Sequence, residues 1–263
     1  MTKLQAHRGV CSQYPENTMA AFKASVDQGY DLIEFDPKFT KDAQIVILHD
    51  RTLNRTARKN GIAPELELKI ENVTLEEARE YEYGSWFSKD FEGEQIPLFT
   101  DILELSAQTG IKLKIDNVWE SFPQEIVEKM FSQIEKYGDK VNIGFTCAKL
   151  ETMTLAANRF PKCDIHYDGG DLSLERLEEV KKIAHGHHLY VWVCFDNDMT
   201  KWFRGTKATP EVCSQVKKYG ELGVWILSKR EELVLAMRDL GAEIVETTGH
   251  IKPEWVSEIS DLL

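Results

Sequence analysis

Short apolar runs alternate along this chain with longer stretches that carry apolar residues at helical spacing. Short runs rich in β-branched and aromatic side chains are typical of buried strands, and apolar residues three and four apart are typical of amphipathic helices. The pattern predicts strands at Leu4–His7, Leu32–Asp36, Ile45–His49, Lys112–Asp116, Val141–Phe145, Cys163–Tyr167, Leu189–Phe195, Val224–Leu227 and Glu243–Thr247. It predicts helices at Met19–Gln28, Asp101–Thr109, Pro123–Tyr137, Ala148–Phe160, Ser173–Ala184, Glu211–Tyr219 and Lys229–Leu240.

This alternation indicates a parallel sheet whose strands are joined by crossover helices. The 263 residues are enough for one (β/α)8 barrel, which typically needs about 250 residues, although length alone would also allow two small domains. Nine strand candidates compete for eight positions, so one of them must be irregular or peripheral. We therefore predict an α/β fold, a TIM-type (β/α)8 barrel that forms a single domain over residues 1–263.

The segment from about residue 51 to residue 97 departs from the alternation and is rich in charged and aromatic residues. Within it, Thr74-Leu75-Glu76-Glu77 predicts a capped helical turn, and Gly84-Ser85-Trp86-Phe87 predicts an aromatic loop. A long segment placed after a barrel strand would lie over the mouth of the barrel, where loops carry function. We interpret residues 51–97 as a small insertion subdomain that follows the His49 strand.

Charge and composition narrow the classes of partner. Lys and Arg number 32 against 44 Asp and Glu, a formal charge of -12, which disfavours binding to nucleic acid or to anionic lipid. An anionic substrate must then be attracted locally, by a metal or by a few placed cations. The first residues do not resemble a signal peptide, and no apolar run is long enough to span a membrane. Five scattered cysteines without a C-x-x-C pair fit reduced thiols, so we expect a cytoplasmic protein.

Glu34 and Asp36 are two residues apart on one predicted strand, so both carboxylates project from the same face. Two like charges held inside an apolar barrel need compensation, which a hard divalent cation such as Mg²⁺ or Ca²⁺ can supply to oxygen ligands. In the alternative interpretation, one carboxylate lies in water at the strand end and the other pairs with a lysine.

His7 and His49 each follow an apolar strand at its C-terminal end, where barrel enzymes place their catalytic groups. Histidine is the side chain best suited to proton transfer near neutral pH. Arg8 adds a planar cation that suits a phosphate, unless it forms only a surface salt bridge. A single histidine in such a place is usually structural, whereas two beside a carboxylate pair favour catalysis.

The order and spacing of these residues resemble the glycerophosphodiester phosphodiesterase family. The matching segments are His7-Arg8-Gly9, Pro15-Glu16-Asn17-Thr18, Glu34-Phe35-Asp36, Thr40 with Asp42, His49-Asp50, Thr52-Leu53-x-Arg55-Thr56, Gly84-Ser85-Trp86-Phe87 and Ile96-Pro97. The resemblance is strong over about the first hundred residues and diffuse afterwards. It implies a TIM-type barrel that hydrolyses glycerophosphodiesters with two histidines and one divalent metal. It further implies His7 and His49 as acid and base, Glu34 and Asp36 as metal ligands, and Arg8 as a phosphate contact.

The next predicted strand departs from the family pattern, which usually ends in Glu-x-Lys. Here Asp116 stands at the place of the metal-binding Glu, and Val118 stands at the place of the phosphate-binding Lys. Lys114 lies on the same strand face as Asp116, and it is either a displaced phosphate contact or an ion-pair partner in the core. Trp225 either lines the substrate pocket or fills the core.

Two other functions stay open: a lyase-like relative that stops at a cyclic phosphate, and a barrel that binds phosphodiesters without turnover. The sequence leaves open the exact substrate, the choice between Mg²⁺ and Ca²⁺, the roles of the two histidines as acid or base, and the oligomeric state. His185-Gly186-His187-His188 precedes a predicted strand and is therefore not expected to be a metal site. Trp202-Phe203-Arg204 is either a lid or an oligomer contact.

Overall fold

Eight parallel strands close into a barrel in the computed structural model, which describes residues 2–198 and 205–263. Around the barrel the strands follow the order β1, β10, β9, β8, β7, β6, β5 and β2. Their bounds are β1 (Lys3–His7), β2 (Leu32–Phe35), β5 (Lys112–Ile115), β6 (Ile143–Cys147), β7 (Asp164–Tyr167), β8 (Leu189–Cys194), β9 (Glu221–Leu227) and β10 (Ile244–Thr247). The predicted TIM-type barrel is confirmed.

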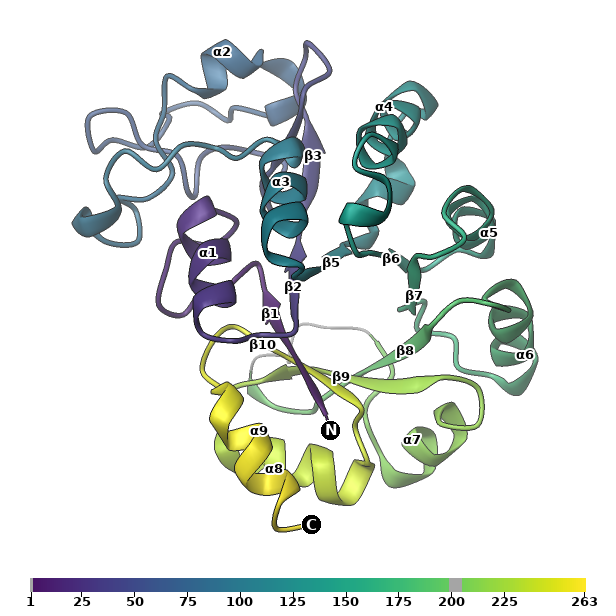
Figure 1. Ribbon diagram of the computed structural model, residues 1–263. Helices are drawn as coiled ribbons and strands as arrows, with labels where there is room; N and C mark the ends of the chain where they lie inside the picture. The colour runs from purple at the N-terminus through teal and green to yellow at the C-terminus, as the bar shows by residue number, and fades with distance from the viewer. Residues whose placement is uncertain (1, 199–204) are drawn as a thin grey trace.

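Helices form a layer around the barrel (Figure 1). They are α1 (Met19–Asp27), α3 (Phe99–Thr109), α4 (Gln124–Glu135), α5 (Leu150–Arg159), α6 (Leu174–Ile183), α7 (Pro210–Val216), α8 (Arg230–Leu235) and α9 (Pro253–Ser260). The sequence pattern predicts all of them except α9, although α8 is shorter than expected because residues 236–240 continue as a π-helical turn. Side-chain caps fix three of the starts. Thr18 accepts a hydrogen bond from the Ala21 N–H, Ser173 from the Arg176 N–H and Thr209 from the Val212 N–H.

Of the nine predicted strands, Ile45–His49 is the peripheral one, so the interpretation that His49 follows a barrel strand is wrong. β4 (Ile45–Ile47) pairs antiparallel with β3 (Pro37–Phe39) in a separate two-stranded sheet, while β2 pairs with β5. Pro37 follows β2 closely and has no N–H to donate to a further strand, so the chain leaves the barrel there. His49 is consequently carried by the small sheet outside the barrel.

The chain after β4 has a hydrophobic cluster of its own. Its buried members are Val46, Leu48, Leu53, Ala57, Ile70, Val73, Ala78, Tyr83 and Ile96. The predicted helical turn is present as α2 (Leu75–Ala78), and Thr74 and Glu77 close a capping box at its start. Figure 1 shows this region beside α1 and α3, on the opposite side of the barrel from α6 and α7. The insertion subdomain at 51–97 stays a prediction, and β3 and β4 already lie outside the barrel before it begins.

Side chains that point into the barrel form a further, smaller hydrophobic cluster. Leu32, Tyr190, Trp192 and Ile244 make up this cluster, and Trp225 packs against it. Because side chains alternate along a strand, Glu34 lies on the same face of β2 as Leu32. Inside the barrel, the carboxylate of Glu34 therefore lies at the C-terminal end of β2, beyond the layer that contains Tyr190 and Trp192.

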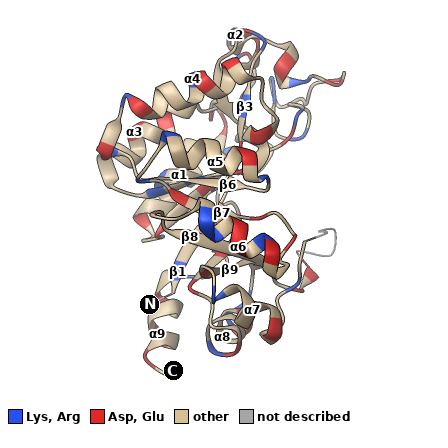
Figure 2. Cartoon of the chain, turned by 90° about the vertical axis from the view of Figure 1, so that its right-hand side faces the viewer, with Lys and Arg blue, Asp and Glu red and all other residues tan. Residues whose placement is uncertain are grey.

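Charge is mixed over the outer helices. Figure 2 shows that acidic and basic residues occur together along α6. None of the helices among the described residues has the length and apolar character needed to cross a bilayer. Trp202-Phe203-Arg204 lies outside the described residues.

Candidate active site

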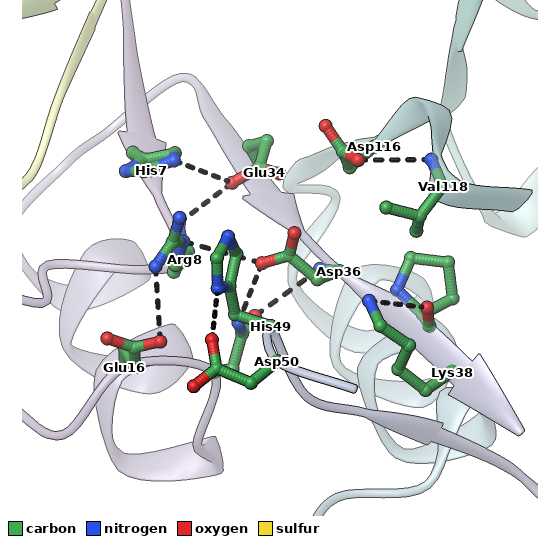
Figure 3. A network of polar contacts seen from close by, with 12 residues as sticks. His7, Arg8, Glu16, Glu34, Asp36, Lys38, His49, Asp50, Asp116 and Val118 are labelled. Carbon is green, nitrogen blue, oxygen red and sulfur yellow. Dashed lines mark hydrogen bonds and ion pairs between the residues drawn. The ribbon is translucent and has the colours of Figure 1, made fainter. Parts of the chain in front are cut away.

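Three carboxylates meet at the C-terminal ends of two neighbouring strands (Figure 3). Glu34 lies on β2, Asp36 follows this strand, and Asp116 follows β5. One oxygen of each lies within 4.8 Å of the others. The pairing of β2 with β5 brings them together, because the Asp116 N–H donates to the Phe35 carbonyl at 3.1 Å. The pairing of these two strands thus places Asp116 beside Glu34 and Asp36.

Burial and charge interactions shift the pKa values of these three carboxyl groups. Burial, followed by the charge of Asp36, raises the pKa of Asp116 to about 6. The pKa of Glu34 is raised for the same two reasons. The pKa of Asp36 is lowered instead, because the charge of Arg8 and other nearby cations outweighs its burial. A largely buried set of oxygen ligands that repel one another fits a hard divalent cation, whose charge would relieve the repulsion.

Arg8 and Asn17 hold Asp36 in place. Arg8 Nε lies 3.4 Å from Asp36 Oδ2, and Asn17 Nδ2 donates to the same oxygen at 2.8 Å. The Arg8 N–H donates to Glu34 Oε2 at 3.0 Å, so the turn after β1 contacts two of the three carboxylates. Gly9 lets this turn lie against α1, since a Cβ at Gly9 would be 2.7 Å from Ala21 Cβ.

His7 lies at the end of β1 and faces the carboxylate cluster. Its Nε2 is 4.0 Å from Glu34 Oε2. Burial lowers the pKa of His7 to about 4, although the charges of Glu246 and Asp36 act in the opposite direction. The imidazole is therefore neutral at physiological pH and able to accept a proton.

His49 reaches the cluster from the small sheet and is held by a chain of ionic contacts. Its Nδ1 is 2.6 Å from Asp50 Oδ1, and Asp50 Oδ2 accepts from Arg55 Nε at 2.7 Å. Arg55 also binds Glu16, which in turn contacts Arg8 Nη1 at 3.2 Å. The hydrogen bonds of His49 and Arg55 lower the pKa of Asp50 below its usual range. This chain of contacts connects the small sheet to the turn after β1. Figure 3 shows its two ends, the contact of His49 with Asp50 and the contact of Arg8 with Glu16.

Beside the cluster is a cavity of about 190 Å³. Its lining includes five predicted site residues, together with Asp168 and Glu246. The five are His7, Glu34, Lys114, Asp116 and Trp225. Lys114 Nζ is 3.3 Å from Glu246 Oε2 and 4.0 Å from the centre of the Trp192 ring. Lys114 is thus ion-paired in the core, although with Glu246 rather than with the three clustered carboxylates, and its contact with phosphate stays a prediction. Trp225 lines the cavity and packs against the inner core, and its contact with substrate stays a prediction.

Several residues near the site were not found by reasoning from the sequence. Asp168 follows β7 directly, so the rule that singled out His7 would also have found it. Glu16 and Asn17 occur in the family pattern, but their contacts to Arg8 and Asp36 depend on the fold. Lys38 gives no local signal beyond its place two residues after Asp36.

The discounted histidine tract lies away from this site. His188 precedes β8, pairs with Glu221 at 2.9 Å and stacks on Tyr190. His187 contacts Cys163. Within the described part of the chain, the possible metal ligands that lie close enough together to share one ion are Glu34, Asp36 and Asp116, with ligand atoms within 4.8 Å of one another.

Comparison with known proteins gives consistent results. A model of the glycerophosphoryl diester phosphodiesterase family matches residues 7–208, which is more than half of the chain. A glycerophosphodiester phosphodiesterase of Bacillus altitudinis is 36% identical over 140 residues, covering 52% of this chain and 54% of that protein. One of Caldanaerobacter subterraneus is 35% identical over 138 residues, covering 52% and 54%. The chain spans about half the length of these curated relatives.

Solved structures of low sequence identity share the fold. A phosphodiesterase of Oleispira antarctica, in complex with the product sn-glycerol-3-phosphate, superposes with a TM-score of 0.72 at 20% identity, covering 99% of this chain and 97% of the other. A putative glycerophosphoryl diester phosphodiesterase of Silicibacter pomeroyi gives 0.74 at 18% identity, covering 100% and 94%.

Proposed function

Because the chain belongs to the glycerophosphoryl diester phosphodiesterase family, we propose that it hydrolyses glycerophosphodiesters to an alcohol and glycerol phosphate. The observation that carries this proposal is the convergence of Glu34, Asp36 and Asp116 beside His7 and His49. The substrate is then a small phosphodiester, and a nucleic acid is disfavoured by the net charge of -12. The cytoplasmic location stays a prediction.

Glu34, Asp36 and Asp116 would hold one divalent cation, Mg²⁺ or Ca²⁺. Their oxygens lie close together, are largely buried and repel one another, which is the donor set that a hard cation prefers. Such a cation supplies positive charge for the phosphate oxygens when it is bound. Arg8, fixed between Asp36 and Glu16, adds a guanidinium that orients the phosphate.

The two histidines transfer the protons of the reaction. His7, neutral because of its burial, accepts a proton from the attacking oxygen. His49 has its Nδ1 bound to Asp50, so Nε2 is the nitrogen that donates a proton to the leaving alkoxide. Asp50 and Arg55 keep the His49 ring in this orientation. The attacking oxygen is either water or a neighbouring hydroxyl of the substrate.

Incubation with a panel of glycerophosphodiesters, followed by phosphorus NMR, tests the proposal. The panel is assayed with Mg²⁺, with Ca²⁺ and with EDTA, and His7→Ala protein is the control for contaminating activity. We expect glycerol phosphate with metal and no product with EDTA. A cyclic phosphate that persists would indicate the lyase-like alternative. Ligand binding without product under all conditions would indicate a non-catalytic barrel and contradict the proposal.

A further inference from the structure

Lys38 is a buried cation with few partners beside the candidate metal site. Only 8% of the residue is exposed. Its Nζ donates one long hydrogen bond, at 3.4 Å, to the carbonyl of Pro37, and it forms no ion pair within residues 2–198 and 205–263. An ammonium group carries three donors, and leaving a buried charge so poorly satisfied is costly. Such a side chain is therefore a candidate for contact with an anion that the protein binds.

The position of Lys38 in the chain directs it toward the site. Glu34, Asp36 and Lys38 are two residues apart in extended backbone, so their side chains fall on one side of the chain. The charges of Asp36 and Asp116 both act on Lys38. β3 packs against the turn Asn117–Ser121. In Figure 3 the end of the Lys38 side chain points toward Asp36, and Val118 lies above it in this view.

The other cations near the cluster are already engaged. Lys114 Nζ is paired with Glu246 at 3.3 Å in the interior of the barrel. Arg8 contacts Asp36 and Glu16 on the side of the turn after β1. The turn that follows β5 contributes no cation beside Asp116, because Val118 is uncharged. On the Asp116 side of the cluster, Lys38 is thus the cation among the described residues that has donors to spare.

We propose that Lys38 binds a phosphate oxygen of the substrate, on the side of the metal site opposite to Arg8. This inference rests on the proposed phosphodiester hydrolysis and adds a residue to it. The rival explanation is that Lys38 only neutralises the charge of the carboxylates. The two explanations differ in a measurable way. Removal of a neutralising charge strengthens metal binding and has no specific effect on phosphate, whereas removal of a phosphate contact weakens phosphate binding to the metal-loaded protein.

Calorimetry on the full chain separates these explanations. Mg²⁺ or Ca²⁺ alone is titrated first, and sn-glycerol 3-phosphate and inorganic phosphate are then titrated into the metal-saturated protein. The variants are Lys38→Met and Lys38→Gln, with Lys38→Arg as the conservative change. Lys41→Met is the matched control, because Lys41 is exposed and lies three residues further along. A melting curve of each variant establishes that it is folded.

We expect Lys38→Met and Lys38→Gln to bind both phosphate probes about 10- to 100-fold more weakly, the effect of losing one charge-assisted hydrogen bond. Lys38→Arg should retain most of the affinity, and Lys41→Met all of it. In the Lys38→Met background, Val118→Lys should restore part of the affinity, since it returns a cation to the adjacent turn. Phosphate affinity within twofold of the wild type in both neutral variants would overturn the proposal.

The same variants are then assayed for kcat/KM on glycerophosphodiesters. A wild-type protein that binds the phosphate probes but releases no product would refute the proposed hydrolysis and leave the test of Lys38 intact. A wild-type protein that is active while both neutral variants bind phosphate normally would refute the role of Lys38 alone.

Discussion

Removal of the charge of Asp168 should stabilise the metal-free protein at alkaline pH. Burial is the main cause that raises the pKa of this carboxyl, to about 7 from 3.8, and the nearby Asp116 and Glu246 add to it. Between pH 3.8 and about pH 7, Asp168 keeps its proton in the folded state but has released it in the unfolded state. Stability therefore declines as pH rises through this window, and the decline is complete above it. The shift of about three pH units corresponds to a cost of about 4 kcal/mol at high pH.

Asp168→Asn keeps the volume of the side chain and an oxygen that accepts the hydrogen bond of Trp225. The variant should thus gain about 2–4 kcal/mol in free energy of unfolding at about pH 8, with a smaller gain at about pH 4.5. Urea denaturation in EDTA, followed by circular dichroism at both pH values, measures the difference. The control is Asp261→Asn, because Asp261 is exposed after α9.

The reasoning would be refuted by a gain that is equal at both pH values, since the argument attributes it to ionisation. An Asp168→Asn protein that is no more stable than wild type at about pH 8 would contradict it too. In that case the neighbouring Lys114 would compensate the carboxylate fully.

Three further predictions concern the site itself. Asp36→Asn should abolish metal binding in calorimetry and activity together while the fold is retained, because a hard cation needs the carboxylate charge; wild-type metal affinity would contradict this. His7→Ala and His49→Ala should each lower kcat by about 100-fold without changing metal affinity. The double variant should lose less in kcat than the product of the two single losses, and a loss equal to that product would mean that the histidines act independently. Lys114→Met should lower the unfolding free energy by about 3–5 kcal/mol, because the buried charge of Glu246 loses its ion-pair partner and keeps, among the described residues, only the hydrogen bond from Gln5. A kcat/KM loss worth about 2–4 kcal/mol would instead make Lys114 a phosphate contact.

Periodicity predicted the barrel well because it reports which side chains are buried. The same property explains its error at Ile45–Ile47. Ile45 and Ile47 pack into the main core, whereas Val46 belongs to the cluster of the small region outside the barrel. A run that is buried on both faces is typical of a barrel strand, but here two different cores bury the two faces. The sequence carries no local signal that distinguishes these situations.

The candidate site was predictable where chemistry and strand position coincide. Glu34, Asp36 and His7 stand at strand ends, and their residue types suggest their roles. The contacts that hold these residues in place were not predictable. Glu16 links Arg8 to Arg55, and this link exists only because the turn after β1 and the small sheet meet in space. Contacts of this kind depend on tertiary structure rather than on spacing along the chain.

The closure of the barrel has a consequence for biosynthesis. β1, which carries His7, pairs with β10, so residues 3–6 are hydrogen-bonded to residues 244–247. Contacts between segments so distant in sequence form slowly, since a long loop must close first. During translation, β1 must wait for almost the whole chain before its second neighbour emerges. A truncated product that lacks β10 cannot complete the strand on which His7 is mounted, so catalytic activity would report that synthesis of the barrel has been completed.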